Sequence, residues 1–307
     1  MEISSQLVKT LREKTNAPMM NCKKALQECG GDMDKAVDWL RQKGLKLADV
    51  RSSRATREGL VLTAVAPDGL KGAMVELNTE TDFVAKMDSF KEITESLVNY
   101  LIKAESLPSD VPALLECQCP NCGRFFKDVV TDAIAKTGEN MKLRRFTVMT
   151  APASGLVHGY IHPGSRLAVL VAVTAEKPGP ELDALAHNLA MHIAWANPLA
   201  LEIADLPPEL IEREKAVYAA KAETEAEEKI KKAGAKALPK DVLIGKMIEG
   251  QLKKFHGEVV LLEQAYIKDP AKTVTAILKE ASGALGVVKI AAYSRFQLGE
   301  EIKGEEQ

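Results

Sequence analysis

The stretch NTETDFVAKMDSF, residues 78–90, directly follows the apolar run AMVEL and marks a change from strand to helix. The apolar run is typical of a strand, and Asp82 can accept the first amide protons of the helix as its N-cap. Phe83 recurs on one helical face with Phe90, Leu97 and Leu101. This spacing predicts that Phe83 is the first core residue of the helix. A catalytic acid, a metal ligand and a docking wedge are the other roles open to an acid and an aromatic ring at such a corner.

The composition predicts a globular protein of about two domains. The chain has 307 residues, 46% hydrophobic and 27% charged, and 41 basic against 43 acidic residues give a formal net charge of −2. This balance argues against a generic nucleic-acid binder, so no direct nucleic-acid partner is expected. No membrane segment is expected, because no apolar run approaches roughly 18 residues. The odd count of five cysteines, without a secretory signal, indicates free thiols and a cytoplasmic location.

Residues 1–45 are predicted to form a bundle of three short helices, the last of which ends at Gly44. Their apolar stripes consist of Leu7, Val8 and Leu11, then Cys22, Ala25, Leu26 and Cys29, then Met33, Ala36, Val37 and Leu40. Met20 and Trp39 lie outside these stripes, so no core position is expected for either. Residues 46–58 are predicted to be a basic, solvated linker, and a phosphate or RNA contact is the alternative.

A weak internal repeat follows the linker. Hairpin patterns begin at Gly59 and Gly155 and turn near Pro67 and Pro163, and each is followed by a helix and a later strand. The repeat predicts an α+β fold with two related core subdomains, each an antiparallel sheet with helices on one side. We expect the first at 59–150 and the second at 151–207 and 258–299.

The second half carries an insertion at 208–257 that is rich in Ala, Glu and Lys and poor in apolar residues. Pro239 breaks it into two helical segments, which predicts a hairpin arm. An arm of 25 helical residues would extend roughly 37 Å. Residues 300–307 are expected to be a tail.

Motifs for catalysis are mostly absent. The chain has no phosphate-binding GxxxxGK[ST] or GxGxxG loop in a strand–turn–helix context, no GxSxG and no HExxH. His187 and His192 lie about 140° apart around a helix and are not expected to share a metal. Thiols in CQCPNCGRFF could hold zinc or form a redox pair, although a second pair of ligands is lacking and a loop with free thiols is favoured. These thiols are Cys117, Cys119 and Cys122.

A set of longer motifs occurs in order from Leu7 to Glu300: LVKTLREKTNAPMMNCKKALQECGGDMDKAVDWLR, NTETDFVAK, KTGENMKLRR, YIHPGSRLAVLV, AMHIAWANPLAL, KMIEGQLKKFHGEVVLLEQAYIKD and YSRFQLGE. The set resembles the elongation factor Ts family, the guanine-nucleotide exchange factors of translation elongation factor Tu. The resemblance implies an N-terminal three-helix module similar to ubiquitin-associated domains, two related core subdomains and a protruding coiled-coil hairpin.

The resemblance also implies roles for particular residues. The motif that would insert into the nucleotide domain of elongation factor Tu and disturb its magnesium site is Thr81, Asp82, Phe83 and Val84. The N-terminal module would dock on the same domain through Met19 and Met20, with Leu11, Arg12 and Lys23 nearby. Met141 and His162 would lie where the core subdomains meet the partner.

The implied partner is elongation factor Tu in its GDP-bound and nucleotide-free states. No cofactor and no bond-making chemistry are implied, and the arm could support a homodimer. Fuller members of the family continue into a C-terminal helix that touches the partner, so this contact is not expected for a chain ending GEEIKGEEQ. The CQCPNCG segment is not part of the family pattern.

Two other functions fit parts of the sequence. One is a zinc or thiol-redox protein that uses the cysteine cluster at 117–122. The other is an interaction scaffold without exchange activity, which would bind another protein through Met19 and Met20.

Overall fold

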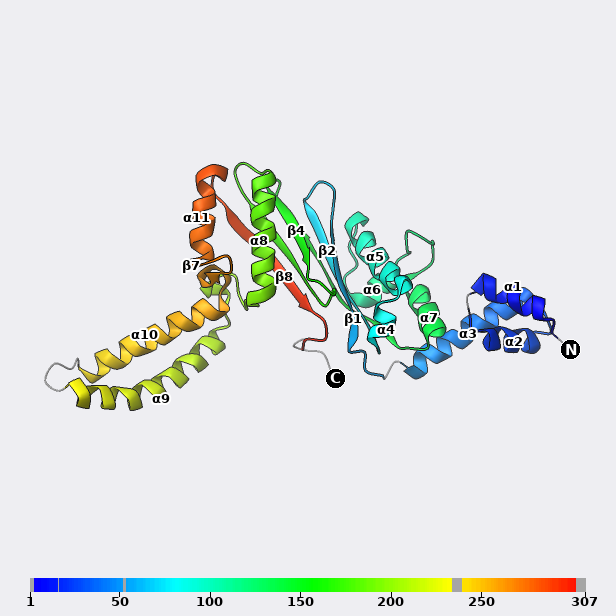
Figure 1. Ribbon diagram of the computed structural model, residues 1–307, viewed down its shortest axis with the longest axis horizontal. Helices are drawn as coiled ribbons and strands as arrows, with labels where there is room; N and C mark the ends of the chain where they lie inside the picture. Colours follow the sequence, from blue (N-terminus) through cyan, green and yellow to red (C-terminus); the bar gives the residue numbers. More distant parts are fainter. Residues whose placement is uncertain (1–2, 16, 52–53, 234–238, 302–307) are drawn as a thin grey trace. The chain divides into compact units, whose positions relative to one another are not determined.

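The computed structural model describes residues 3–15, 17–51, 54–233 and 239–301 (Figure 1). The chain divides into two compact units. The first unit consists of Met1–Thr150, Gly159–Leu170 and Phe296–Gln307, and the second of Ala151–His158 and Val171–Arg295. Helices combine with antiparallel strand pairs, so the predicted α+β class is confirmed. The finer division into two related core subdomains stays a prediction.

The N-terminal bundle is built from α1 (Ser5–Thr15), α2 (Met19–Glu28) and α3 (Met33–Arg51). Its core contains the predicted stripe residues, of which Val8, Leu11, Cys22, Ala25, Leu26 and Ala36 are buried. Trp39 is half-buried against this core, contrary to expectation, and the Lys43 ammonium lies 5.1 Å from the centroid of its ring. Met20 is 73% exposed, as expected.

Helix α3 continues to Arg51, so the prediction that it ends at Gly44 is wrong. A glycine inside a helix costs only about 1 kcal/mol, and the residues after it, LKLAD, are compatible with a helix. Gly44 lies against α7 (Phe126–Thr137), where an added Cβ would be 3.2 Å from the Cβ of Ala135. The glycine therefore permits close helix packing. Of the expected linker 46–58, residues 52–53 lie outside the described residues.

The first sheet has the strand order β1–β2–β3, with strands Glu58–Val65, Lys71–Thr79 and Met141–Thr150. Both pairings are antiparallel, and Leu62 lies opposite Val75. The β1–β2 turn contains the predicted Pro67, and Gly69 in the same turn has a φ of 73°. Strand β2 is central and almost wholly buried. The helices that connect β2 to β3 are α4 (Asp82–Ala85), α5 (Asp88–Lys103), α6 (Val111–Leu115) and α7.

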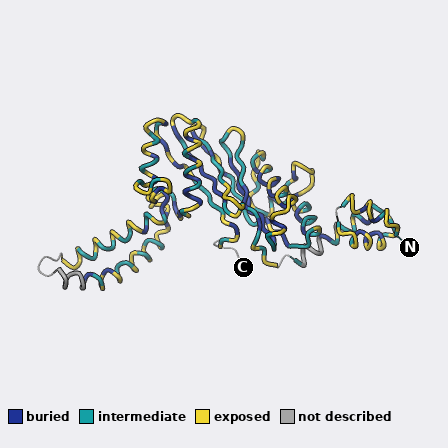
Figure 2. Tube along the Cα trace, in the orientation of Figure 1, coloured by how far each residue is buried: buried dark blue, intermediate teal, exposed yellow. Residues whose placement is uncertain are grey.

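Helix α5 packs across β1 and β2, and this contact makes the main core of the first unit (Figure 2). Its fully buried side chains include Leu77, Phe90, Leu97, Leu101 and Phe126. The amphipathic pattern of α5 therefore gives a face that covers the sheet.

The second sheet has the order β4–β5–β8, with strands Gly155–Ile161, Leu167–Thr174 and Lys289–Gln297. Its turn contains Gly164 with a φ of 90°, close to the predicted Pro163. Helix α8 (Pro180–Ala196) follows β5, and α11 (Val274–Leu285) precedes β8. A small sheet pairs β6 (Ala265–Tyr266) with β7 (Asp269–Thr273).

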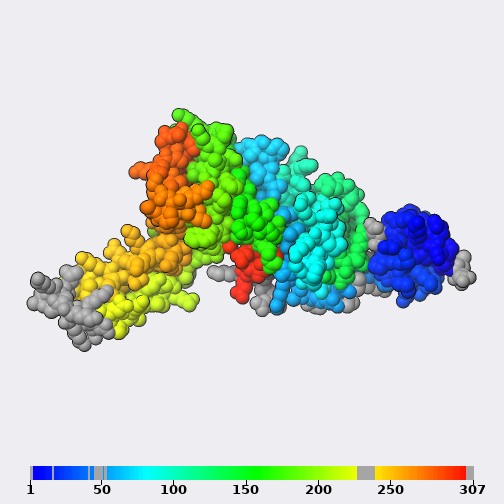
Figure 3. All heavy atoms as spheres, in the orientation of Figure 1, coloured from blue at the N-terminus to red at the C-terminus, as the bar shows by residue number. Residues whose placement is uncertain are grey.

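Helices α9 (Pro208–Ala233) and α10 (Lys240–Val259) lie against each other as a hairpin (Figures 1 and 3). Short 3₁₀ helices at Ile203–Asp205 and Leu261–Glu263 flank it. Between the two helices only small side chains are fully enclosed in the described part of α9, namely Ala222 and Ala226. Pro239 precedes α10, as the sequence predicts. Among the described residues, no helix is long and apolar enough to cross a membrane.

Candidate partner-binding site

The site is built around the turn that joins β2 to the four-residue helix α4. Thr81, and not Asp82, is the N-cap of α4: its hydroxyl oxygen accepts a hydrogen bond from the Val84 amide at 3.5 Å. Asp82 is instead the first helical residue and forms an ion pair with Lys86 at 2.6 Å. The hydrogen bond from Lys86 and the charge of its ammonium group hold the pKa of Asp82 below its ordinary value. Asp82 is therefore an ionised surface carboxylate.

Phe83 is 80% exposed, so the prediction that it is a core residue is wrong. The reason is that α4 ends at Ala85 and α5 begins only at Asp88. The continuous helical face on which Phe83 would have aligned with Phe90 therefore does not exist. Val84 and Ala85 are buried instead, which turns the Phe83 ring away from the core.

Glu139, which lies just before β3, fixes this turn. Its carboxylate accepts hydrogen bonds from the Thr79 hydroxyl at 2.9 Å, the Thr81 amide at 3.0 Å and the Thr81 hydroxyl at 2.6 Å. In return, the Asn140 amide donates to Glu80 Oε1 at 2.6 Å. Since hydrogen bonds to an ionised carboxylate are the stronger kind, the turn is held firmly while its aromatic ring faces solvent.

The hydrogen bonds from Thr79 and Thr81 to Glu139 form a clamp on this turn. Glu80 and Asn140 extend the clamp to Arg54, which lies between α3 and β1. The Arg54 guanidinium lies 3.3 Å from Glu80, and the Asn140 side chain donates to the Arg54 carbonyl at 2.9 Å. The sequence reasoning gave no role to Glu139 or Glu80. The available signal was the acidic residue directly after the helix stop Gly138.

The expected docking residues of the bundle differ in exposure. Met19 is 52% and Met20 73% exposed, and Arg12 and Lys23 are exposed as well. Leu11 is fully buried in the bundle core, so it cannot touch a partner as the chain stands. It lies in the bundle core, on the same helix as Arg12.

Met141 and His162 also lie in different surroundings. Met141 is buried and pairs with Thr79 in the sheet, next to the clamped turn. His162 is exposed in the β4–β5 turn, where its Nδ1 atom lies 2.9 Å from the Tyr160 hydroxyl. Among the described residues, the structure shows no hydrogen bond or ion pair that links His162, Met19 or Met20 to the Thr81 turn.

The cysteine segment forms a tight turn before α7. Cys119 is buried and Cys122 exposed, and the Gly123 amide donates to the Cys119 carbonyl at 2.8 Å. Cys117 donates to the Ala113 carbonyl at 3.3 Å, and its contact with the Tyr100 hydroxyl, together with burial, raises the pKa of Tyr100. No group of three or more metal-binding side chains occurs in the part of the chain that the structure describes. The zinc hypothesis therefore gains no support.

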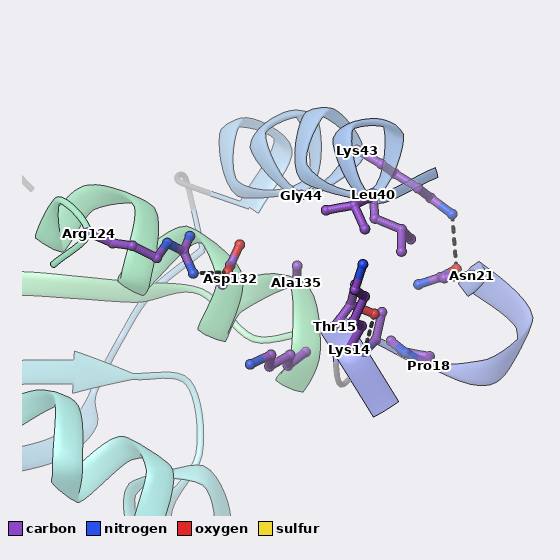
Figure 4. A pocket seen from close by; sticks show the side chains of 13 residues that line it. Lys14, Thr15, Pro18, Asn21, Leu40, Lys43, Gly44, Arg124, Asp132 and Ala135 are labelled. Carbon is purple, nitrogen blue, oxygen red and sulfur yellow. Dashed lines mark hydrogen bonds and ion pairs between the residues drawn. The ribbon is translucent and has the colours of Figure 1, made fainter. Parts of the chain in front are cut away.

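A cavity of about 370 Å³ lies between the bundle and α7 (Figure 4). Its lining includes Lys14, Lys43 and Lys136 and the ion pair between Arg124 and Asp132, whose atoms are 2.7 Å apart. Lys43 donates to the Asn21 side chain at 3.0 Å. The residues expected to bind the partner do not line this cavity.

Comparison with known proteins identifies a family. The sequence model of the family described as "Elongation factor TS" matches residues 80–300. The chain is 42% identical over 308 residues to elongation factor Ts of Magnetococcus marinus, covering 100% of this chain and 96% of the relative. It is 40% identical over 311 residues to that of Nitratidesulfovibrio vulgaris strain DP4, covering 100% and 99%. The protein of Sinorhizobium medicae is 39% identical over 312 residues, covering 100% and 96%. The chain therefore belongs to the elongation factor Ts family of translation elongation factors.

Proposed function

We propose that this chain binds elongation factor Tu in its GDP-bound and nucleotide-free states and promotes GDP release, which allows reloading with GTP. The observation that carries the proposal is Phe83, an aromatic ring 80% exposed on a turn that is fixed by hydrogen bonds. Membership of the elongation factor Ts family supports a partnership with elongation factor Tu in general.

The Phe83 ring supplies a wedge. Burying a phenylalanine side chain in a partner is favourable by about 1.5–3 kcal/mol. The hydrogen bonds from Thr79 and Thr81 to Glu139 hold the turn before the partner arrives. Less conformational freedom is then lost on binding, so more of the contact energy is available to distort the partner.

Asp82 supplies a negative charge beside the wedge. GDP on a phosphate-loop protein is held by backbone amides, a lysine and a bound Mg²⁺ ion. An ionised carboxylate at the partner's metal site would disturb the groups that hold Mg²⁺, and loss of the ion leaves the phosphate charge less neutralised. GDP then dissociates faster. Coupling is reciprocal, so GDP weakens the binding of this chain by the same factor. The chain itself makes or breaks no covalent bond.

A second contact is proposed for the bundle, through Met19 and Met20 with Arg12 and Lys23 beside them. The exposure of the two methionines supports this contact. Leu11, Val84 and Met141 are buried and would act by supporting their exposed neighbours. His162 would be a further contact in the β4–β5 turn.

The proposal is tested by the release of fluorescent GDP from elongation factor Tu at several Mg²⁺ concentrations, with the wild type and Asp82→Asn. At millimolar Mg²⁺, the wild type should speed release strongly and Asp82→Asn less so. When a chelator has removed Mg²⁺, the two proteins should converge, because the metal no longer needs to be displaced. If the wild type causes no acceleration at any Mg²⁺ concentration, the proposal is wrong.

The proposed activity places the chain in the cytoplasm, where translation takes place. A homodimer through the α9–α10 arm stays a prediction. Sedimentation of the wild type and of a chain shortened at the arm would test it: a concentration-dependent dimer that disappears on shortening would support it, and a monomer throughout would contradict it.

A further inference from the structure

Two histidines from distant parts of the sequence meet in the second unit. His158 lies on β4 and His187 on α8, and the Nε2 atom of His158 is 3.1 Å from the Nδ1 atom of His187. Asp183, one helical turn before His187, places its Oδ1 atom 2.8 Å from the Nδ1 atom of His158. We propose that His158 and His187 bind a divalent transition-metal ion of the Zn²⁺ class, with Asp183 orienting His158.

The carboxylate fixes the state of His158 that a metal requires. Because an ionised carboxylate only accepts hydrogen bonds, the Nδ1 atom of His158 carries the proton that it donates to Asp183. The Nε2 atom of a neutral ring is then left with a lone pair, which accepts the Nδ1–H of His187 in the metal-free chain. A bound ion would take the place of this proton, and His187 would then carry its proton on Nε2. Histidines that bind metals almost always donate their other ring N–H to such a partner, which orients the ring and raises its basicity.

The separation of the two nitrogens matches shared coordination. Zn²⁺ lies about 2.0–2.1 Å from a histidine nitrogen, so two tetrahedral ligands are about 3.4 Å apart. The observed 3.1 Å requires only a small opening of the pair. The two rings meet edge to face, with centroids 5.1 Å apart and planes at 82°. His187 is exposed, so an ion and its water ligands can reach the ring from solvent.

The remaining coordination positions would be taken by water. No third metal-binding side chain joins these two within the described ranges. The side chain of His158 is 18% exposed and that of Asp183 59%, so water reaches the site. Imidazole ligands suit Zn²⁺, Cu²⁺ and Ni²⁺ rather than Mg²⁺ or Ca²⁺. The prediction that His187 does not share a metal with His192 is kept, since the proposed partner of His187 is on a strand.

The test is calorimetric titration of the full chain with Zn²⁺, repeated with His158→Gln, His187→Gln and Asp183→Asn. We expect one ion per chain, binding at least ~10-fold weaker in either histidine variant, and a loss of about tenfold in Asp183→Asn. Urea unfolding of each variant shows that it is folded, and no elongation factor Tu is needed. The result is therefore independent of the proposed exchange function.

Matched controls separate this site from other ligands of the chain. His162→Gln removes an exposed histidine elsewhere, and Cys122→Ser removes the exposed thiol of the cysteine turn. Both should bind Zn²⁺ like the wild type, and bound Co²⁺ should show no thiolate charge-transfer band. Binding that is unchanged in His158→Gln and His187→Gln, or that is lost in Cys122→Ser, would overturn the proposal.

Discussion

The two three-stranded sheets have central strands of opposite character. Strand β2 is buried almost throughout but contains Glu76, Asn78 and Thr79, whereas the buried part of β5, residues 168–173, is wholly apolar. The exit from β2 is held by the side chain of Glu139, and the exit from β5 by backbone hydrogen bonds such as Ala175 N–H to the Ser154 carbonyl at 2.9 Å. Helix α8 then begins after Gly179 without a side-chain cap.

The difference shows how a similar strand order can serve two purposes. Apolar packing is enough to hold a central strand such as β5 in place. Polar groups in β2 add directional bonds that fix both its neighbours and the turn at its end. In the first sheet, the bonds from Thr79 and Thr81 to Glu139 hold the turn on which Phe83 is exposed.

The largest expected effect comes from Glu76. Its fully buried carboxylate lies 3.1 Å from Arg144 and 2.6 Å from Arg145, whose side chains are only 12% and 18% exposed. Glu76→Ala leaves these guanidinium groups without that carboxylate, which should lower the free energy of unfolding by about 3–5 kcal/mol in urea titration. A loss below about 1 kcal/mol would show that the polar centre of β2 is dispensable.

Leu170→Ala is the matched change in the second sheet, since Leu170 is fully buried in β5. A cavity in an apolar core should cost about 2–5 kcal/mol. Leu170→Ala should leave the salt dependence of the free energy of unfolding unchanged, whereas Glu76→Ala should alter it. An equal salt dependence in both variants would contradict the contrast between the two central strands.

A smaller effect is expected for Glu139→Gln. The neutral amide keeps the shape of the side chain but weakens the three hydrogen bonds from Thr79 and Thr81, which should cost about 1–3 kcal/mol of stability. At a temperature where Glu139→Gln is fully folded, it should accelerate GDP release from elongation factor Tu less than the wild type does. Normal release by a folded Glu139→Gln protein would show that Phe83 needs no clamp.

The smallest effect concerns His192, which is buried in the second unit. Its Nδ1 atom accepts from the Ile267 amide at 3.2 Å, and its Nε2 atom lies 3.1 Å from Gln264 Oε1, so the neutral ring is held in one tautomer. Burial lowers the pKa of His192 below its ordinary 6.5. The unfolded chain therefore binds a proton at this residue more readily than the folded chain does. The stability that the neutral, buried His192 contributes is complete above pH 6.5 and declines as the pH falls below it.

Urea unfolding at about pH 7.5 and about pH 5.5 checks this sign. The wild type should be less stable at the lower pH. His192→Gln should be less stable than the wild type at both pH values. The difference between its stabilities at the two pH values should be smaller than the same difference for the wild type. If the wild type and the variant show the same pH dependence, His192 is not the group responsible.

Features set by neighbouring residues were predictable from the sequence. The hairpin turns at Gly69 and Gly164 and the break at Pro239 follow from local backbone preferences. Features that depend on distant residues were not. Gly44 on α3 packs against Ala135 on α7, and the turn that carries Phe83 is held by Glu139, 58 residues beyond Thr81. The meeting of His158 with His187 joins residues that no spacing rule connects.

The most direct test of the central claim is the rate of fluorescent GDP release from elongation factor Tu with Phe83→Ala. Phe125→Ala is the control, because Phe125 is also exposed and lies in the same unit. We predict that Phe83→Ala speeds release at least ~10-fold less than the wild type, which corresponds to about 1.4 kcal/mol of lost contact energy. Its unfolding midpoint should be unchanged, and Phe125→Ala should act like the wild type. Equal acceleration by Phe83→Ala and the wild type would contradict the account, because the exposed ring would then contribute nothing to exchange.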